Sequence, residues 1–192
     1  MDIFYFVIIS YFVGSIPFGF IFTKLVLKED IRKIGSGNIG ATNALRTGNK
    51  TVGYMTLVFD ILKAILPILY IKFFYADYLF ICSLCIFLGH VFPLWLRFKG
   101  GKGVATYLGI LFCINIYLGL SFIIVWLSIY FIFKYSSLGS IIASLIIPIL
   151  TLSTNLNEFN YFFVIMFVLI LFTHRENVKR LINKEESKTK IY

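Results

Sequence analysis

Three long stretches without charge limit the folds that this sequence can adopt. They cover Ile3–Thr23, Tyr78–Leu96 and Val104–Phe133, and none contains Asp, Glu, Lys or Arg. Each is long enough to cross a bilayer, because a membrane-spanning helix needs about 20 mainly apolar residues. Only 14% of the residues are charged, against about 25% in an average soluble domain. We therefore expect an all-α, polytopic integral membrane helix bundle, with residues 1–192 forming a single membrane domain.

The first stretch is predicted to be a retained span and not a secretory signal. It follows Asp2 instead of a basic start, is too long, and lacks a cleavage site of small residues. Within it, Pro17 removes a backbone donor, and Gly14 and Gly19 allow another helix to approach closely. We expect a kink in the first helix at this point.

The basic residues fit membrane topology better than nucleic-acid binding. The net charge is +9, but the Lys and Arg residues alternate with the spans and form no single groove-sized patch with interleaved aromatic residues. They gather at 24–50, at 97–102, at Lys134 and at 175–190. Because basic loops stay in the cytoplasm, we expect the N-terminus outside and the C-terminus inside. The cytoplasmic parts are then loops at about 24–50 and 97–103 and a tail at about 174–192.

The number of spans depends on one long stretch. Further spans are expected at Thr51–Ile71, Leu138–Leu152 and Phe159–Thr173. As one helix, Val104–Phe133 would be about 45 Å long, too long for a single crossing of a ~30 Å core and marginal for two. A bend at Asn115–Gly119 would give two short or re-entrant helices and seven membrane segments in all. A single crossing would give six and place the tail outside; we prefer seven because that count satisfies the charge rule.

The least membrane-like part of the chain is the glycine-rich stretch 34–46. Closely spaced glycines favour positive φ and can turn successive N–H groups into one concavity that binds phosphate. Arg46 could add a bidentate cation; an ordinary polar loop is the other interpretation. The candidate residues here are Gly35, Ser36, Gly37, Asn38, Gly40, Thr42, Asn43 and Arg46.

A second glycine-rich stretch, 97–106, opens a hydrophobic helix. A helix N-terminus favours anions, and Lys102 could reach a phosphate held against the glycines. The stretch differs from a nucleotide-binding loop, since Leu96 and Gly103 stand where that motif needs Gly and Ser or Thr. A positive-inside anchor would explain the charges but not the glycines. The candidate residues are Arg97, Lys99, Gly100, Gly101, Lys102, Gly103 and Thr106.

Two histidines and one ionic pair complete the candidate residues. His90 lies near a span end and could be a substrate contact or a hydrogen-bonded structural group. His174 and Asn177 are spaced to share one helix face, although a solvated helix end is also open. Asp60 and Lys63 interrupt a span at i, i+3, and we expect a pair that faces the bundle and supports the site. No Cys or His set has metal spacing, and Cys82, Cys85 and Cys113 fit packing best, so no metal is expected.

These residues give the sequence a resemblance to the bacterial acyl-phosphate:glycerol-3-phosphate acyltransferases of the PlsY type. The resemblance covers nearly the whole chain and is carried by several ordered motifs, at residues 14–19, 36–43 with Arg46, 89–93, 97–106 and 174–177. That family is described as a seven-span bundle with its site open to the cytoplasm. It lacks the HxxxxD motif of other glycerolipid acyltransferases, and here Trp95 and Lys179 follow the histidines at the fifth position.

The resemblance implies transfer of a fatty acyl group from acyl phosphate to the 1-hydroxyl of glycerol 3-phosphate, giving lysophosphatidic acid and phosphate. It implies a bacterial inner-membrane location, membrane lipids as partners, and an upstream enzyme that forms acyl phosphate. No cofactor is expected. Ser36, Arg46, Lys102, His174 and Asn177 would be catalytic, and His90 and the remaining candidates of the two glycine-rich stretches would bind substrate or phosphate.

Two questions stay open on the residues alone. Substrate phosphate or His174 could accept the hydroxyl proton, since the unperturbed pKa of histidine lies near the operating pH. A carrier for phosphorylated metabolites would also place anion sites at one membrane face, although the chain shows neither repeated halves nor a matched pair of broken helices.

Overall fold

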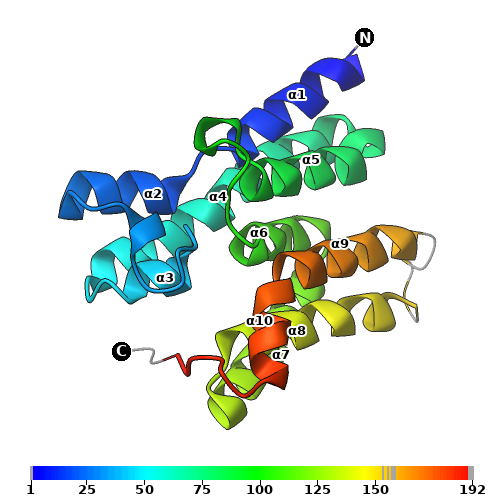
Figure 1. The fold of residues 1–192 in the computed structure, drawn as a ribbon. Helices are drawn as coiled ribbons and strands as arrows, with labels where there is room; N and C mark the ends of the chain where they lie inside the picture. Colours follow the sequence, from blue (N-terminus) through cyan, green and yellow to red (C-terminus); the bar gives the residue numbers. More distant parts are fainter. Residues whose placement is uncertain (1, 153, 155, 157–158, 190–192) are drawn as a thin grey trace. The chain divides into compact units, whose positions relative to one another are not determined.

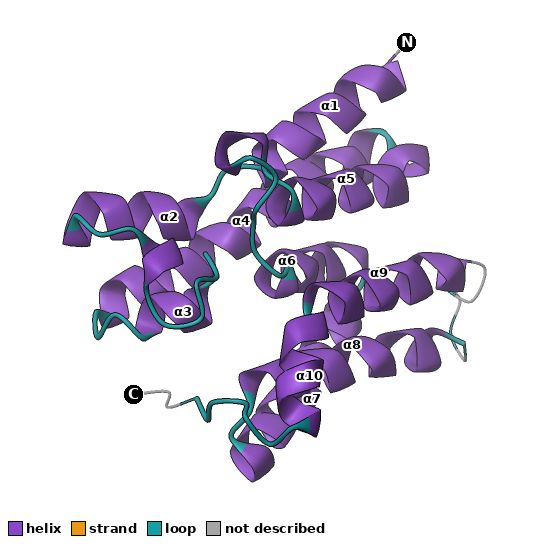
Figure 2. Cartoon of the chain, viewed as in Figure 1, coloured by secondary structure: helices purple, strands orange, loops and turns teal. Residues whose placement is uncertain are grey.

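The computed structural model describes residues 2–152, 154, 156 and 159–189. Throughout this part the regular structure is helical, and no strand occurs in it (Figures 1 and 2). The all-helical fold expected from the sequence is confirmed. The main helices are α1 (Asp2–Gly14), α2 (Phe18–Phe22), α3 (Ala41–Leu45), α4 (Lys50–Phe74), α5 (Leu79–Val91), α6 (Val104–Ile114), α7 (Ile116–Phe133), α8 (Ser136–Thr151), α9 (Asn160–Thr173) and α10 (Arg175–Ile182).

The helices form two compact units that divide between Ile114 and Asn115. The first unit contains α1 to α6 and the second contains α7 to α10. The expectation that residues 1–192 act as a single membrane domain stays a prediction.

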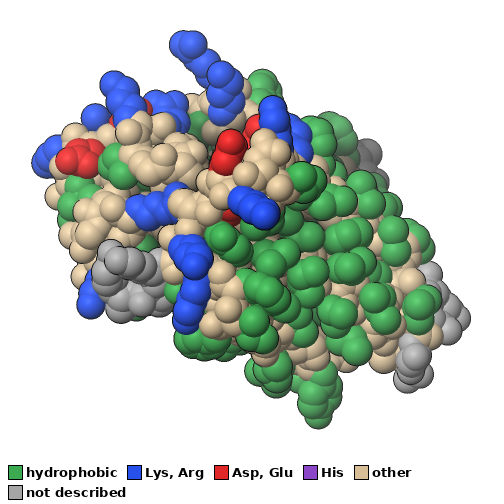
Figure 3. Space-filling model, turned by 60° about the horizontal axis from the view of Figure 1, so that its bottom comes forward, with side chains coloured by type: hydrophobic (Ala, Val, Ile, Leu, Met, Phe, Trp, Pro, Cys, Tyr) green, Lys and Arg blue, Asp and Glu red, His purple; other side chains and the backbone are tan. Residues whose placement is uncertain are grey.

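Three helical segments are long and apolar enough to cross a membrane: Ile3–Leu27, Ala76–Leu96 and Ile116–Phe133. A fourth is added if α9 and α10, which meet at a bend of 63°, count as one broken span. Helices α6 and α8 are shorter and apolar. The seven segments and their orientation therefore stay predictions. In Figure 3, hydrophobic side chains cover a broad area of the displayed face, and the Lys and Arg side chains lie outside it.

The predicted kink in the first helix is confirmed. Helix α1 ends at Gly14, and α2 begins only after Pro17. A Cβ atom at Gly14 would collide with the backbone of Ile86 in α5, and one at Gly89 would collide with the backbone of Tyr11 in α1. The two helices lie side by side in Figure 1. Glycine is therefore needed on both sides of this contact, because only a missing Cβ lets the backbones come so close.

The predicted interruption near Asn115 is also confirmed. Asn115 has extended backbone angles, and its Oδ1 accepts a hydrogen bond of 2.8 Å from the N–H of Tyr117, which caps α7. On the other side, the Nζ of Lys72 donates to the carbonyl oxygens of Cys113 (2.7 Å) and Ile114 (3.3 Å). Both helix ends at the break are thus supplied with side-chain partners.

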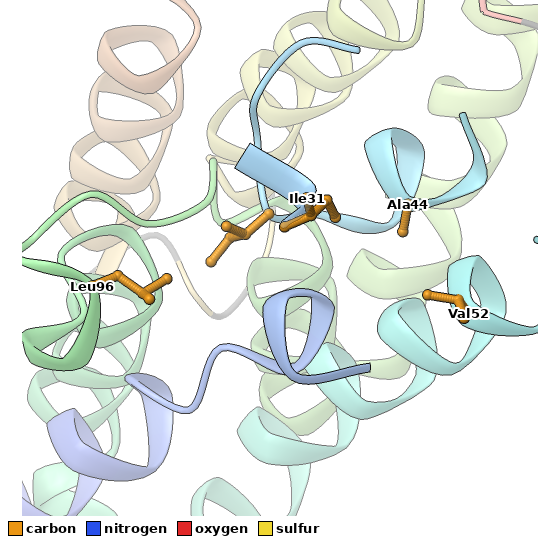
Figure 4. Packing of buried hydrophobic residues seen from close by; sticks show 5 residues of the cluster. Ile31, Ala44, Val52 and Leu96 are labelled. Carbon is orange, nitrogen blue, oxygen red and sulfur yellow. The ribbon is translucent and has the colours of Figure 1, made fainter. Parts of the chain in front are cut away.

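A small buried cluster joins the two glycine-rich segments of the first unit. It consists of Ile31, Ile39, Ala44, Val52 and Leu96 (Figure 4). Leu96 ends the short 3₁₀ turn Leu94–Leu96, directly before the second glycine-rich stretch. The others come from the loop before α3, from α3 itself and from the start of α4. Apolar burial at Leu96 therefore fixes residues 97–103 against the loop that carries residues 34–46.

Candidate active site

The side chain of Asn43 organises the first glycine-rich loop. It is 2% exposed, and its Nδ2 donates to the carbonyl oxygens of Ile31 (3.2 Å), Ile34 (2.9 Å) and Asn38 (2.8 Å). Its Oδ1 accepts from the N–H of Ser36 at 2.9 Å. One buried amide therefore satisfies four backbone groups of the loop, which would otherwise need water or lose stability.

The glycines of this loop shape the backbone, but not as an open anion nest. Gly35 and Gly37 have φ of +53° and +72°, as predicted, whereas Gly40 has φ of −82° and caps α3. Gly40 is extended because a residue before a helix takes β-region angles, so positive φ was wrong there. The N–H of Ser36 binds Asn43, and the N–H of Gly37 donates to Ile34 at 2.9 Å. These two amides are used within the fold.

The loop presents side chains to its surroundings. Ser36 and Arg46 are exposed, and Asn38 and Thr42 are half-buried. Nearby, Arg32 pairs with Asp30, with 2.7 Å between Nη2 and Oδ2. The hydrogen bonds from Arg32 lower the pKa of Asp30 to about 2. The charge of Arg32 is therefore compensated locally by Asp30.

The second glycine-rich segment folds back on the end of α5. The N–H groups of Gly100 and Gly101 donate to the carbonyl oxygens of Val91 (3.0 Å) and His90 (3.1 Å). A Cβ atom at Gly101 would collide with the imidazole ring of His90. These glycines are explained by close packing, and their amides are not available to hold a phosphate as the sequence had suggested.

The start of α6 keeps the properties expected of an anion site. Gly103 has φ of +81° and lies directly before Val104, the first residue of α6. Lys102 is half-buried beside this helix N-terminus, and Arg97 and Lys99 are exposed. The first amides of a helix have no partner within it, and its dipole favours negative charge. The buried Thr106 hydroxyl also has no hydrogen-bond partner among the residues described.

His90 belongs to a buried polar cluster with Asp60 and Lys63. The Nζ of Lys63 lies 2.7 Å from Oδ1 of Asp60 and 2.9 Å from Nδ1 of His90. All three residues are at most 4% exposed. The predicted pair facing the bundle is confirmed, while the contact with His90 was not foreseen. No sequence period could have shown it, because 27 residues separate Lys63 from His90.

The second unit holds His174 and Asn177. Helix α9 ends at Thr173, α10 begins at Arg175, and the chain bends by 63° between them. The side chains of His174 and Asn177 are 2% and 4% exposed, which rules out a solvated helix end. Nδ1 of His174 lies 2.8 Å from the carbonyl oxygen of Ile170. That carbonyl can only accept, so the proton lies on Nδ1 and Nε2 is the basic nitrogen.

Glu186 in the C-terminal tail binds Asn177, a contact that the sequence did not indicate. Its Oε1 accepts from Nδ2 of Asn177 and from the hydroxyl of Ser137, each at 2.7 Å. Its Oε2 lies 2.7 Å from Nε of Arg180. Burial alone would raise the pKa of Glu186, but these three hydrogen bonds and the charge of Arg180 outweigh it and lower the pKa. The tail is therefore fastened to α8 and α10 by a carboxylate.

Replacing Glu186 with Gln should loosen this tail. Charge-assisted hydrogen bonds contribute about 1.5–3 kcal/mol each, so we expect at least about tenfold faster amide exchange over residues 185–189. Thr189 is a direct reporter, since its N–H donates to the carbonyl of Lys134 at 2.9 Å. The exposed neighbour Glu185, replaced with Gln, is the matched control.

Lowering the pH should loosen the tail in the same way as the substitution Glu186→Gln. Because the pKa of Glu186 is lowered, the contact is fully present above the ordinary carboxyl range and is lost as the pH falls through the lowered pKa. Equal exchange in the two variants and the parent protein, with no effect of acid, would contradict a role for this carboxylate in holding the tail.

No group of three or more His, Cys, Asp or Glu that could hold a metal ion occurs among the residues described. Within the first unit, the buried cluster around Leu96 joins the two glycine-rich segments, one of which carries Arg46 and the other Lys102. Within the second unit, it brings His174 and Asn177 to one bend.

Comparison with known proteins decides the family. The family model for glycerol-3-phosphate acyltransferase matches residues 4–184. A glycerol-3-phosphate acyltransferase of Pelagibacter ubique is 70% identical over 184 residues, which are 95% of this chain and 95% of the relative. This chain belongs to the glycerol-3-phosphate acyltransferase family. A relative from Brucella anthropi, with the same description, is 46% identical over 181 residues, covering 94% of this chain and 90% of that protein.

Solved structures of this family also match the fold of this chain. A crystal structure of PlsY (YgiH), described as an integral membrane glycerol 3-phosphate acyltransferase in its glycerol 3-phosphate form, matches with a TM-score of 0.93 at 36% identity. The match covers 99% of this chain and 96% of that one. The lysophosphatidic acid form matches with a TM-score of 0.89 at 35% identity, covering 98% and 95%. In keeping with these matches, this chain is a multi-pass integral membrane protein, and the regular structure of its described residues is helical.

Proposed function

We propose that this chain transfers a fatty acyl group from acyl phosphate to the 1-hydroxyl of sn-glycerol 3-phosphate. The hydroxyl oxygen forms a bond to the acyl carbon, the bond from that carbon to the phosphate oxygen breaks, and a base takes the hydroxyl proton. The products are lysophosphatidic acid and phosphate, in the first acylation step of phospholipid synthesis. The observation that carries the proposal is the near-complete match to an acyltransferase whose structure is in a glycerol 3-phosphate form.

The first unit supplies the cations that two phosphate-bearing substrates require. Lys102 beside the N-terminus of α6 would bind one phosphate and Arg46 the other, since both side chains lie on segments joined by the Leu96 cluster. Ser36, Asn38 and Thr42 would donate to phosphate or to the developing oxyanion, with Arg97 and Lys99 adding positive charge. Holding both substrates in attack geometry lowers the barrier without any covalent intermediate on the protein.

Other candidate residues are better assigned to holding the site than to touching substrate. The side-chain amide of Asn43 is hydrogen-bonded to the loop backbone, and the backbone N–H groups of Gly100 and Gly101 are hydrogen-bonded to the end of α5. Gly35, Gly37 and Gly40 shape the first loop, and Gly103 shapes the entry to α6. We therefore propose that phosphate accepts its hydrogen bonds from other side chains of the site and from the first backbone N–H groups of α6.

The identity of the base is tested by replacing His174 with Ala. Transfer should fall only a few fold if substrate phosphate accepts the proton, because His174 then supports the site without proton transfer. A loss of about 10²–10⁴-fold would instead identify His174 as general base. Asn177→Ala, measured in parallel, reports whether its proposed substrate contact matters separately.

We further propose seven membrane segments, with the N-terminus outside, the C-terminus in the cytoplasm and the site facing the cytoplasm of a bacterial inner membrane. The grouping of Lys and Arg in segments 24–50, 97–102 and 175–190 supports this orientation. An upstream enzyme that makes acyl phosphate would then supply the donor from the same side. A tag after residue 192 that is reached by a membrane-impermeant reagent in intact cells would contradict this orientation.

The decisive experiment is acyl transfer to labelled glycerol 3-phosphate by the purified protein in lipid vesicles, with acyl phosphate, acyl-CoA or acyl carrier protein as donor. Lysophosphatidic acid formed only from acyl phosphate would support both the reaction and the donor. Product from a thioester would overturn the donor assignment. No product from any donor, with a protein shown to be folded, would overturn the enzyme and favour a carrier for phosphorylated metabolites, which uptake of labelled glycerol 3-phosphate would then test.

A further inference from the structure

The buried Lys63 ammonium has one ion-pair partner and two hydrogen-bond partners. It lies 2.7 Å from Oδ1 of Asp60, and it is hydrogen-bonded to the carbonyl oxygen of Ile16 at 2.8 Å and to Nδ1 of His90 at 2.9 Å. An ammonium group has three N–H donors and no acceptor. His90 must therefore accept at Nδ1 and carry its proton on Nε2. This arrangement fixes both the position and the tautomer of the imidazole.

The same imidazole is the surface on which the second glycine-rich loop rests. Gly101 lies against the ring so closely that a Cβ atom would collide with Nε2. The Gly101 N–H also donates to the His90 carbonyl at 3.1 Å. Lys102 is the next residue in the chain, and α6 begins two residues later. A displacement of the His90 ring would thus be passed directly to the backbone that carries Lys102.

Stability alone does not account for a buried ionic cluster of this kind. Taking charges out of water costs several kcal/mol per ion, and replacing a buried ion pair with neutral groups of similar size is often neutral or stabilising. In a membrane protein such groups are costlier still and usually have a functional reason. Here the cluster joins Ile16 at the helix break, α4 and the end of α5, and the His90 ring carries this network to the glycine-rich loop.

We propose that Asp60, Lys63 and His90 are positioning residues, which fix the loop 100–103 and so place Lys102 for the phosphate of the acceptor substrate. This inference rests on the proposed function. It assigns His90 a role through Gly101 in place of direct substrate contact. Because these three residues determine the position of the Lys102 ammonium, their loss should weaken binding of the acceptor substrate more than it slows the chemical step.

The test is the double variant Asp60→Asn with Lys63→Met, which removes both charges together and leaves no unpaired ion. We expect a folded protein with a moderately lower melting temperature, because the carbonyl of Ile16 and Nδ1 of His90 lose the Lys63 donor. Its KM for glycerol 3-phosphate should rise about tenfold or more, because displacing a binding group by about 1 Å can cost up to 10²-fold. The KM for the acyl donor should stay the same. Calorimetric binding of glycerol 3-phosphate should weaken by a similar factor.

Lys72→Met is the matched control. Lys72 is on the same helix and also donates to backbone carbonyls, those of Cys113 and Ile114, but it contacts the end of α6 instead of the glycine-rich loop. It should leave acceptor binding unchanged. Glycerol 3-phosphate binding that is unchanged in the double variant, or weakened equally in Lys72→Met, would overturn the positioning role.

A second variant covers the case in which the double variant does not fold. Gly101→Ala leaves the ionic cluster intact but pushes the loop off the His90 ring, so it should also weaken acceptor binding about tenfold. Normal acceptor binding by Gly101→Ala would overturn the inference. A folded parent protein that binds no glycerol 3-phosphate would instead overturn the proposed function itself, so the two failures are distinguishable.

Discussion

Replacing Lys102 with Ala should lower acyl transfer by about 10²-fold or more and leave the protein folded. Lys102 stands at the N-terminus of α6, in a loop that backbone hydrogen bonds of Gly100 and Gly101 hold against the end of α5. Its ammonium would neutralise a phosphate, and removing a preorganised charged donor typically costs about 10²–10³-fold in rate. The measurement is initial rate in vesicles with acyl phosphate and glycerol 3-phosphate, together with the melting temperature.

Lys33→Ala is the control for this variant. Lys33 is exposed and basic and lies in the neighbouring loop, so the same charge is lost from the same unit. It should keep most of the activity, because a surface charge acts only through a screened field. If Lys102→Ala keeps near-normal activity, or if both variants lose activity equally, Lys102 is not part of the site.

Changing Asn43 to Asp should abolish most of the activity by opening the first glycine-rich loop. The substitution keeps the size of the side chain, but it turns Nδ2, which faces three carbonyl oxygens, into a carboxylate oxygen. Each buried carbonyl left without a donor costs about 1–3 kcal/mol, and the new charge repels all three. We expect at least about 10²-fold lower transfer and faster amide exchange over residues 31–46.

Asn49→Asp gives a matched comparison. Asn49 caps α4 by accepting from the N–H of Val52 at 3.1 Å, and Asp is as good an N-cap as Asn. This variant should keep both its activity and its exchange pattern. Normal exchange in Asn43→Asp would show that the loop does not depend on the amide, and the assignment of Asn43 as the organiser of the loop would fail.

The features predicted correctly from sequence are those that depend on residues close together in the chain. Pro17 cannot continue a helix hydrogen-bond ladder, so the interruption after Gly14 could be read directly. The polar Asn115 within 30 uncharged residues likewise marked a break, because the alternative was a helix too long for one crossing. Asp60 and Lys63 share a helix face at i, i+3, which is enough to predict their pairing.

The features that sequence could not supply depend on contacts between distant segments. The glycines near Lys102 were expected to hold phosphate with their amides, but those amides cap α5. The same pattern of glycines fits either phosphate binding or close packing against α5, and only the position of His90 in the fold distinguishes these two roles. Glu186 gave no signal either, because an acid in a basic tail has no period or motif that points to Asn177.

The lysine cap on α6 has a consequence for synthesis of the chain. The last carbonyls of α6 receive donors from Lys72, which is translated about 40 residues earlier. The side-chain donor for the carbonyls of Cys113 and Ile114 is therefore already present once Ile114 has been made, before α7 exists to continue the backbone. We expect the first unit to be able to settle once residues 1–114 have emerged from the ribosome, so that a chain stalled far enough beyond Asn115 for α6 to have emerged would already protect α4 and α6 from protease.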